Sequence, residues 1–163
     1  MLTKIFQLFD KLMVAIDRKR IVMDRVNNEP YLVRYYLFLK DRQRFPFNVF
    51  LHKFLKSDPD DQHDHPWSYA TFIVRGGYYE WVPIYKDTAI VGERKVWRGP
   101  GHFRRCAANS FHRIELKEGV TAWTIFMPGP QQRLWGFLTH KNWSNFNWIE
   151  SEQYLSERAA KKN

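Results

Sequence analysis

Three histidines are the residues of this sequence whose types and spacing are best suited to chemistry. In the segment His63-Asp64-His65, one residue separates two of them. On an extended strand, residues i and i+2 point to the same side, so both imidazoles can face one metal ion. His112 lies in a later apolar segment and shares its inward parity with Ile114. Because neutral imidazole is a common protein ligand for Fe, Zn, Cu, Ni and Mn, the three histidines predict one divalent metal site with open coordination positions.

Polar residues on neighbouring segments extend this predicted site. His52 has the strand parity of Phe50 and Phe54 and is expected to point inward, either as an acid or base near the metal or as a core histidine bonded to the backbone. Arg75 has inward parity on its own segment and could bind a substrate carboxylate or phosphate; the alternative is a strand-end arginine in solvent. Glu80 could supply a carboxylate ligand, although an exposed strand acid is the simpler interpretation.

The first segment of the chain predicts an amphipathic helix from residue 2 to about residue 20. Its apolar residues recur at spacings of three and four: Leu2, Ile5, Phe6, Phe9, Leu12, Met13 and Ile16. A helix that packs across a sheet is the favoured interpretation. A membrane-surface helix is the weaker alternative, because acidic residues dilute the basic face.

The middle of the chain predicts successive antiparallel strands in short aromatic and β-branched runs. We expect them near 31–39, 47–55, 67–75, 78–85, 90–97, 110–116, 121–127 and 134–139. Gly76-Gly77 and residues 117–119 are expected to form hairpin turns. Residues 151–155 predict a short closing helix. Eight short strands predict a mainly β sandwich or jelly roll.

The length and composition predict one domain. The chain has 163 residues, of which 17% are aromatic, and this indicates a substantial packed core. We expect an N-terminal helical segment over residues 1–28 that packs on a β domain over 29–142. A tail with a short helix is expected over 143–163.

The balance of charged residues favours an anionic partner. Lys and Arg exceed Asp and Glu by 26 to 17, for a net charge of +9 at pH 7, which suits nucleic acid, phosphate esters or carboxylates. The single cysteine, Cys106, cannot form an internal disulfide. Because the sequence shows neither a secretory leader nor an apolar run of about 18 residues, we expect a soluble cytoplasmic protein that does not bind membranes.

The arrangement of the histidines resembles the two sequence motifs of the cupin superfamily. The first motif, G-x5-H-x-H-x3,4-E-x6-G, is met by His63, His65 and Gly76, whereas Tyr69 stands at the Glu position and Ser57 at the leading Gly. The second motif, G-x5-P-x-G-x2-H-x3-N, aligns with Gly101, Ala107, Asn109, His112 and Leu116. Only its first Gly and its His are identical. The resemblance covers about residues 47–127.

The chain also looks like a group of small single-domain cupins found in phage and bacterial genomes. The segments that carry this likeness are 51–55, 63–67, 76–78, 111–116 and 133–137. The resemblance implies a jelly-roll barrel, the double-stranded β-helix, with one divalent metal ion bound by His63, His65 and His112. Because cupins host many reactions, the fold alone does not decide the chemistry.

A three-histidine set without the usual glutamate is similar to the iron centre of thiol dioxygenases. The resemblance implies an Fe(II)-dependent dioxygenase that acts on a small anionic substrate, with Tyr69 and His52 tuning protonation. In thiol dioxygenases a cysteine takes the place of the glutamate and can crosslink to a tyrosine. Cys106 stands elsewhere in this sequence, so that crosslink is not carried over.

Two other classes of function stay open. One is a sugar or acid isomerase or epimerase that uses Zn, Mn or Ni as a Lewis acid. The other is a non-catalytic binding module whose basic surface holds nucleic acid or a phosphorylated ligand, although nucleic acid is less favoured than a small anionic substrate. A homodimer formed through sheet edges is compatible with the aromatic content.

Overall fold

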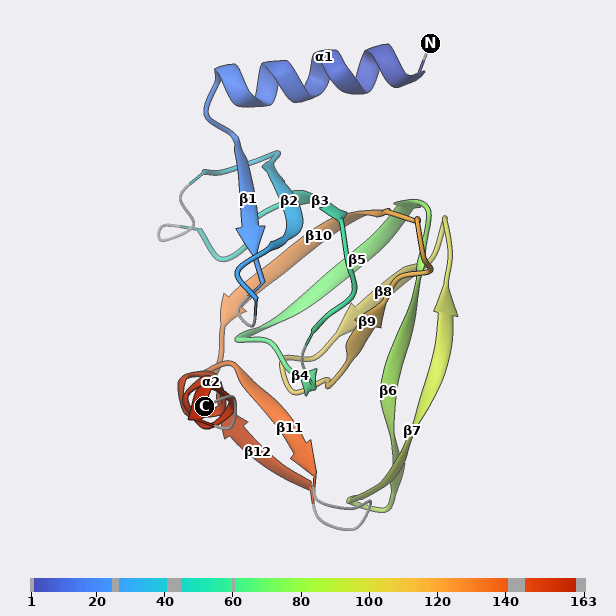
Figure 1. Cartoon of the computed structure of the whole chain (residues 1–163), viewed down its shortest axis with the longest axis vertical. Helices are drawn as coiled ribbons and strands as arrows, with labels where there is room; N and C mark the ends of the chain where they lie inside the picture. The colour runs from blue at the N-terminus through green and yellow to red at the C-terminus, as the bar shows by residue number, and fades with distance from the viewer. Residues whose placement is uncertain (1, 25–26, 41–44, 60, 141–145, 161–163) are drawn as a thin grey trace.

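The computed structural model describes residues 2–24, 27–40, 45–59, 61–140 and 146–160 (Figure 1). Two helices lie near the ends of this part of the chain, α1 (Leu2–Ala15) and α2 (Ser151–Ala160). The strands between them are β1 (Lys19–Met23), β2 (Pro30–Tyr36), β3 (Phe50–Phe54), β4 (Gln62–His63), β5 (Trp67–Arg75), β6 (Tyr78–Lys86), β7 (Ala89–Arg98), β8 (Phe103–Cys106), β9 (Arg113–Glu115), β10 (Ala122–Gln131), β11 (Gly136–His140) and β12 (Phe146–Glu150). The predicted mainly β class is confirmed.

The strands form three antiparallel sheets that pack in the manner of a jelly roll. The six-stranded sheet has the order β1-β2-β3-β10-β5-β8, and the two three-stranded sheets have the orders β7-β6-β9 and β12-β11-β4. A buried apolar cluster joins the six-stranded sheet to the β7-β6-β9 sheet; its members are Leu32, Phe54, Ile73, Tyr78, Ile114 and Ala122. Among the described residues, the sheets do not join into a closed barrel.

Gly76-Gly77 carries the chain from one sheet to another. β5 pairs with β8 and β10, whereas β6 pairs with β7 and β9, so the two strands beside the glycines are not partners. Gly76 has a φ of 77°, and a Cβ there would lie 2.2 Å from the carbonyl oxygen of Thr121. Only glycine fits this corner. The predicted hairpin was wrong, as was the one at residues 117–119, which connect β9 to β10 in the other sheet.

The N-terminal helix is shorter than its apolar pattern predicts. It ends at Ala15, and Asp17 takes a φ of 54°. The amide of Asp17 donates to the carbonyl of Val14, and the amide of Arg18 donates to the carbonyl of Met13. These two hydrogen bonds form a Schellman motif, which terminates the helix. Residues 19–23, predicted as the helix end and the segment after it, form β1 instead and pair with β2.

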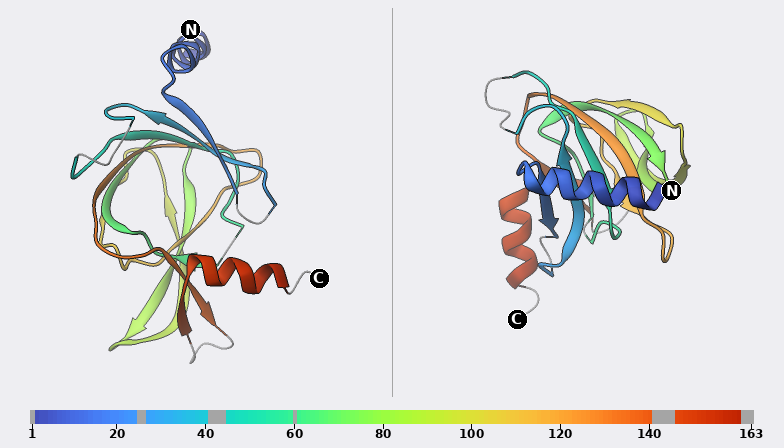
Figure 2. Two further views of the ribbon diagram at one scale, coloured as in Figure 1. Left: turned by 90° about the vertical axis from the view of Figure 1, so that its left-hand side faces the viewer. Right: turned by 90° about the horizontal axis from the view of Figure 1, so that it is seen from above.

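α1 covers the outer face of the six-stranded sheet, as Figures 1 and 2 show. Phe6 packs on Trp123 with ring centroids 5.1 Å apart, and Phe9 packs on Tyr35 at 5.2 Å. The hydroxyl of Tyr35 donates to the carboxylate of Asp10 at 2.7 Å. The interpretation as a helix that packs across a sheet is therefore supported by these contacts. No helix of the described residues is long and apolar enough to cross a membrane.

The C-terminal segment braces the loop before β4. β12 pairs with β11, so part of the predicted tail is strand. α2 follows, and its buried Tyr154 stacks on Phe137 with ring centroids 4.0 Å apart. The hydroxyl of Tyr154 also donates to the carboxylate of Asp61 at 2.9 Å. These contacts hold the residues that lead into the first histidine.

Candidate metal centre and its cavity

His63 and His112 lie directly opposite each other. His63 ends β4, and His112 immediately precedes β9. Two backbone hydrogen bonds close the bridge between them, 2.9 Å from the amide of His63 to the carbonyl of His112 and 3.0 Å in the reverse sense. Such a hydrogen-bonded antiparallel pair places both side chains on the same face. The histidine segment was expected to be extended, but no strand range was predicted for it, because a strand of two residues has no periodicity to detect.

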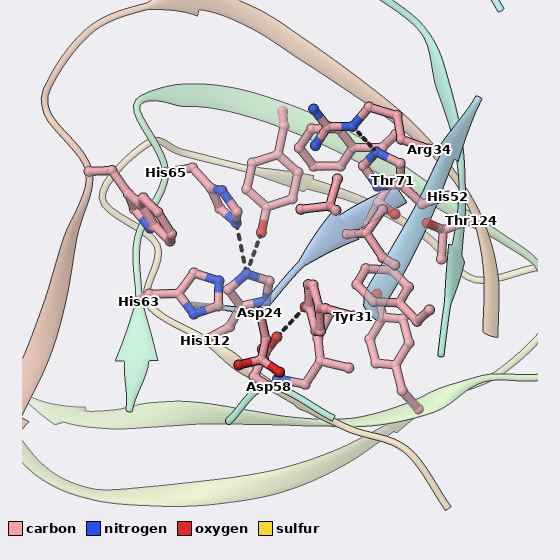
Figure 3. Close-up of a pocket in the computed structure, with 18 of the residues that line it drawn as sticks. Asp24, Tyr31, Arg34, His52, Asp58, His63, His65, Thr71, His112 and Thr124 are labelled. Carbon is pink, nitrogen blue, oxygen red and sulfur yellow. Dashed lines mark hydrogen bonds between the residues drawn. The ribbon is translucent and has the colours of Figure 1, made fainter. Parts of the chain in front are cut away.

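His65 completes the group from the segment after β4. Its backbone amide donates to the carbonyl of Ala108 at 3.1 Å, which orients its ring toward the other two. One nitrogen of each histidine lies within 4.8 Å of the others, so the group can hold a metal ion. Figure 3 shows the three rings gathered on one side of the cavity.

The separation of two of these nitrogens fits a metal ion. Nε2 of His65 and Nε2 of His112 are 2.9 Å apart. Two ligand nitrogens that each lie about 2.05 Å from one ion at a right angle are also about 2.9 Å apart. Burial, together with the nearby His112 and His63, holds the pKa of His65 well below its usual value, so its ring is neutral and can offer a lone pair. The donor set therefore suits a divalent cation.

Glu80 orients His112 from behind. Its carboxylate lies 3.0 Å from Nδ1 of His112, which assigns the ring proton to Nδ1 and leaves Nε2 as the ligand atom. Arg98 and Arg104 both form ion pairs with the same carboxylate. Burial acts to raise the pKa of Glu80, but the interaction with His112, the charge of Arg104 and the hydrogen bond from Arg98 outweigh it and lower this pKa to about 2. Glu80 is thus buried and ionised, and the expectation of an exposed strand acid was wrong.

Asp64 holds the two neighbouring histidines in place from the opposite side of the chain. Its side chain is fully buried. It accepts hydrogen bonds from the amide of Gly136 at 2.8 Å and from the indole of Trp148 at 3.0 Å, and it pairs with Arg133 at 3.1 Å. Asp64 therefore ties the histidine segment to β11 and β12, while His63 and His65 face the other way.

The histidines line a cavity of about 480 Å³ between the sheets. Its apolar lining includes Phe54, Tyr78 and Phe126. His52 lies in the same wall on β3, only 4% exposed, and its Nε2 accepts a hydrogen bond from Nε of Arg34 at 3.0 Å. Burial, and then the charge of Arg34, hold the pKa of His52 well below its usual value. His52 is therefore an inward, neutral histidine whose partner is a side chain rather than the backbone.

No protein-family model and no curated protein matches the sequence. Among solved structures, a cupin-2 domain from Rhodospirillum rubrum matches with a TM-score of 0.52 and 10% identity over 86% of this chain and 82% of that one. The protein has the cupin fold.

Two further solved structures share this fold. The polyketide cyclase RemF from Streptomyces resistomycificus matches with a TM-score of 0.56 and 13% identity over 86% of each chain. Fe(II)-HppE, solved with an alternative substrate, matches with a TM-score of 0.51 and 15% identity over 69% of this chain and 56% of that one. At these identities the likeness shows the cupin fold alone, and the reaction has to be argued from the site.

Tyr69, at the glutamate position of the cupin motif, reaches the histidine group. Its hydroxyl oxygen lies 3.5 Å from Nε2 of His112, and its ring lies 4.6 Å from that of His65. Cys106 is the cross-strand neighbour of Tyr69 on β8 and forms a hydrogen bond with its phenol. This cysteine therefore lies beside the site. Burial, followed by the effect of Cys106, raises the pKa of Tyr69 well above its usual value, so the phenol keeps its proton.

Arg75 does not line the cavity of this cupin-fold protein. It is exposed at the end of β5. The register between β5 and β10 shifts there, because Ile73 pairs with Thr124 and Arg75 pairs with Trp123. This bulge breaks the alternation on which the inward prediction rested. The position of Arg75 therefore gives no support to a role in substrate binding.

Two arginines that line the cavity, Arg20 and Arg34, were not predicted as site residues. Arg34 lies in a strand that was predicted correctly, and it alternates in phase with the buried Leu32. This parity could have predicted that Arg34 points inward. Arg20 had no such signal, because its strand was predicted as the end of a helix.

Proposed function

We propose that this protein is a metal-dependent enzyme, most specifically a non-haem Fe(II) oxygenase that acts on a small anionic molecule. The observation that carries the proposal is the group of three histidines in the wall of a largely apolar cavity. Three neutral ligands leave a divalent ion its full positive charge and open positions toward the cavity. An anionic substrate is the natural partner of such a centre.

Iron is favoured among the metals that imidazole binds. A facial set of three protein ligands with open positions is typical of non-haem Fe(II) oxygenases, in which two histidines and one carboxylate are the common set. Fe(II)-HppE, which shares the fold, supports iron as the first metal to test. When bound, Fe(II) supplies the redox chemistry that lets O2 react with an organic molecule.

The side chains of the protein supply orientation, protons and the exclusion of water. Glu80 keeps Nε2 of His112 directed at the ligand position through its hydrogen bond to Nδ1. Tyr69 keeps its proton and can donate it to an oxygen placed near His112. Phe126, whose ring centroid lies 6.0 Å from that of His65 and 5.0 Å from that of Tyr69, displaces water beside the histidines. The proton-transfer role predicted for His52 stays a prediction.

The test is oxygen uptake by protein loaded anaerobically with Fe(II). Pools of small carboxylates and phosphonates serve as substrates, with the His63→Ala variant as a control that lacks one ligand. Fe(II)-dependent uptake by the wild type, lost in the variant, is the expected result. Substrate turnover with Zn(II) or Mn(II) in the absence of O2 would overturn the oxygenase and identify the isomerase or epimerase class. Failure to take up any of these metals would overturn metal-dependent function altogether.

A further inference from the structure

A row of polar side chains crosses the six-stranded sheet on its cavity face. Arg20 of β1 is the register partner of Arg34 of β2, Arg34 is the partner of His52 of β3, and His52 is the partner of Thr124 of β10. All four residues line the cavity. Figure 3 shows Arg34, His52 and Thr124 on the side of the view away from the three ligand histidines. We call these four residues the polar row.

The two arginines of the row face each other without a carboxylate between them. Like charges directly opposite on adjacent strands repel, and the charge of Arg20 lowers the pKa of Arg34 after the larger effect of burial. Within the described part of the chain, neither Arg20 nor Arg34 forms an ion pair with an acidic side chain. A guanidinium keeps its proton in proteins, so this end of the cavity carries positive charge.

The acidic residues in the cavity lining are all engaged elsewhere. Asp24 pairs with Lys56, which also binds Glu29. Asp58 accepts hydrogen bonds from the hydroxyl of Tyr31 and from the amide of Ile114. The third, the carboxylate behind His112, already balances two other arginines. None of these carboxylates is positioned to neutralise the polar row.

Arg34 is held in one orientation. Its Nε donates to Nε2 of the buried His52 at 3.0 Å, and its guanidinium lies over the ring of Phe50, 4.8 Å from the centroid. The side chain of Tyr36 also forms a hydrogen bond with the guanidinium. His52 is stacked against Phe126 with ring centroids 5.2 Å apart, which fixes it in turn. A guanidinium fixed in this way loses little conformational entropy when it binds an anion.

We propose that Arg34 and Arg20 bind the oxyanion of the substrate, a carboxylate or a phosphate-type group, at the end of the cavity away from the histidines. Phe126 lies between the two groups, because its ring centroid is 6.0 Å from that of His65 and 5.2 Å from that of His52, so the part of the ligand that passes it is expected to be apolar. Together with the proposed metal function, on which this inference rests, the arginine site assigns a substrate with an oxyanion at one end and the reacting group at the other. His52 is a positioning residue that orients Arg34.

The experiment measures ligand binding to metal-free protein by isothermal titration calorimetry. Benzoate and phenylphosphonate probe the two oxyanions, and benzamide is the neutral match in shape. We expect at least one anion to bind more tightly than benzamide, and we expect Arg34→Met to weaken that binding by about tenfold or more. Arg20→Met is expected to weaken it less, because Arg20 is exposed. Arg75→Met, a change of an exposed arginine outside the cavity, is expected to leave it unchanged.

Each outcome decides the proposal. Equal binding of benzamide and both anions, or anion binding that survives both Arg34→Met and Arg20→Met, overturns it. If Arg34→Met fails to fold, the exposed Arg20→Met still gives the answer. Because no metal is present, the result is independent of the oxygenase test. Anion binding without Fe(II)-dependent oxygen uptake supports the arginine site and rejects the oxygenase. Oxygen uptake without arginine-dependent anion binding supports the oxygenase and rejects the arginine site.

Discussion

The two ends of the cavity balance charge in opposite ways. At the histidine end, buried carboxylates stand behind the three histidines: Glu80 forms a hydrogen bond with His112, and Asp64 accepts a hydrogen bond from Gly136 that fixes the segment carrying the other two. At the arginine end, Arg34 and Arg20 have no acidic partner within the described residues. At one end, negatively charged carboxylates support neutral imidazoles. At the other end, positively charged guanidinium groups have no acidic partner among the described residues.

On our proposals, this difference separates residues suited to hold a cation from residues suited to bind an anion. A carboxylate behind an imidazole fixes its tautomer and raises its basicity, which prepares it for a metal. A guanidinium without a carboxylate in a partly buried wall is unfavourable until an anion arrives. The two ends of the cavity are therefore suited to ligands of opposite charge, and substitutions at each end are expected to have different consequences.

The largest expected effect is the loss of the metal ion at the histidine end. His112→Ala removes one ligand of three, and we expect it to retain less than about a tenth of the Fe(II) or Zn(II) bound by the wild type. Elemental analysis after loading and gel filtration measures this. His102→Ala, which changes a histidine outside the group, is the matched control. Full metal content in His112→Ala would contradict the assigned site.

The second effect concerns the carboxylate behind His112. Glu80→Gln keeps the shape of the side chain but removes its charge, and we expect metal affinity to fall by roughly 10- to 100-fold. Competition with a chromophoric chelator measures the affinity. Glu115→Gln removes a carboxylate on the outer side of β9, where it pairs with Lys95, and serves as the control. Equal affinity in both variants would show that Glu80 does not support the ligand.

The same carboxylate predicts an acid dependence of the metal-free protein. The pKa of Glu80 is lowered to about 2 from an ordinary value of 4.5. The stability contributed by its ionised form is complete above pH 4.5 and is lost as the pH falls from there toward 2. Chemical unfolding between pH 2.5 and 6 should show a steeper acid loss for wild type than for Glu80→Gln. Parallel curves would mean that the pKa of Glu80 is not lowered.

A smaller effect is expected at Asp64, because it acts on the backbone and not on an imidazole. Asp64→Asn keeps one acceptor oxygen but loses the ion pair with Arg133, at a cost of about 1–3 kcal/mol in the free energy of unfolding. Metal affinity should fall less than in Glu80→Gln. Urea unfolding and the chelator assay measure the two quantities. A larger loss of metal than at Glu80 would reverse the ranking of the two carboxylates.

The smallest effect is expected at Arg75, the exposed arginine that sequence parity had placed at the substrate. Arg75→Gln should change the free energy of unfolding by no more than about 0.5 kcal/mol and leave metal content as it is. Thermal unfolding and elemental analysis check both. A clear loss of metal in this variant would show that the exposed end of β5 is coupled to the site.

Strand parity succeeded where the strand runs unbroken and failed where it does not. His52 was predicted to share a face with Phe50 and Phe54, and all three are buried on the same face of β3. Arg75 was predicted from the same rule, but the bulge at the end of β5 turns it outward. A bulge depends on the partner strand, so the alternation of one segment could not reveal it.

The local pattern of the chain determined much of this protein. The spacing of apolar residues identified the first helix and most strands, because side-chain burial repeats with the period of each element. Two histidines one residue apart and a third at an inward position predicted the group of three that the structure brings together, although the bridge between His63 and His112 is a tertiary contact.

The tertiary structure alone decided which strands pair and which charges meet. The glycine corner joins two sheets, β1 replaces the end of a predicted helix, and Glu80 became a buried support instead of an exposed acid. Each of these depends on contacts between residues far apart in the chain. The free energy of these contacts depends on residues from other elements, so the periodicity of one segment cannot predict them. The pairing of β1 with β2, for example, is what places Arg20 opposite Arg34.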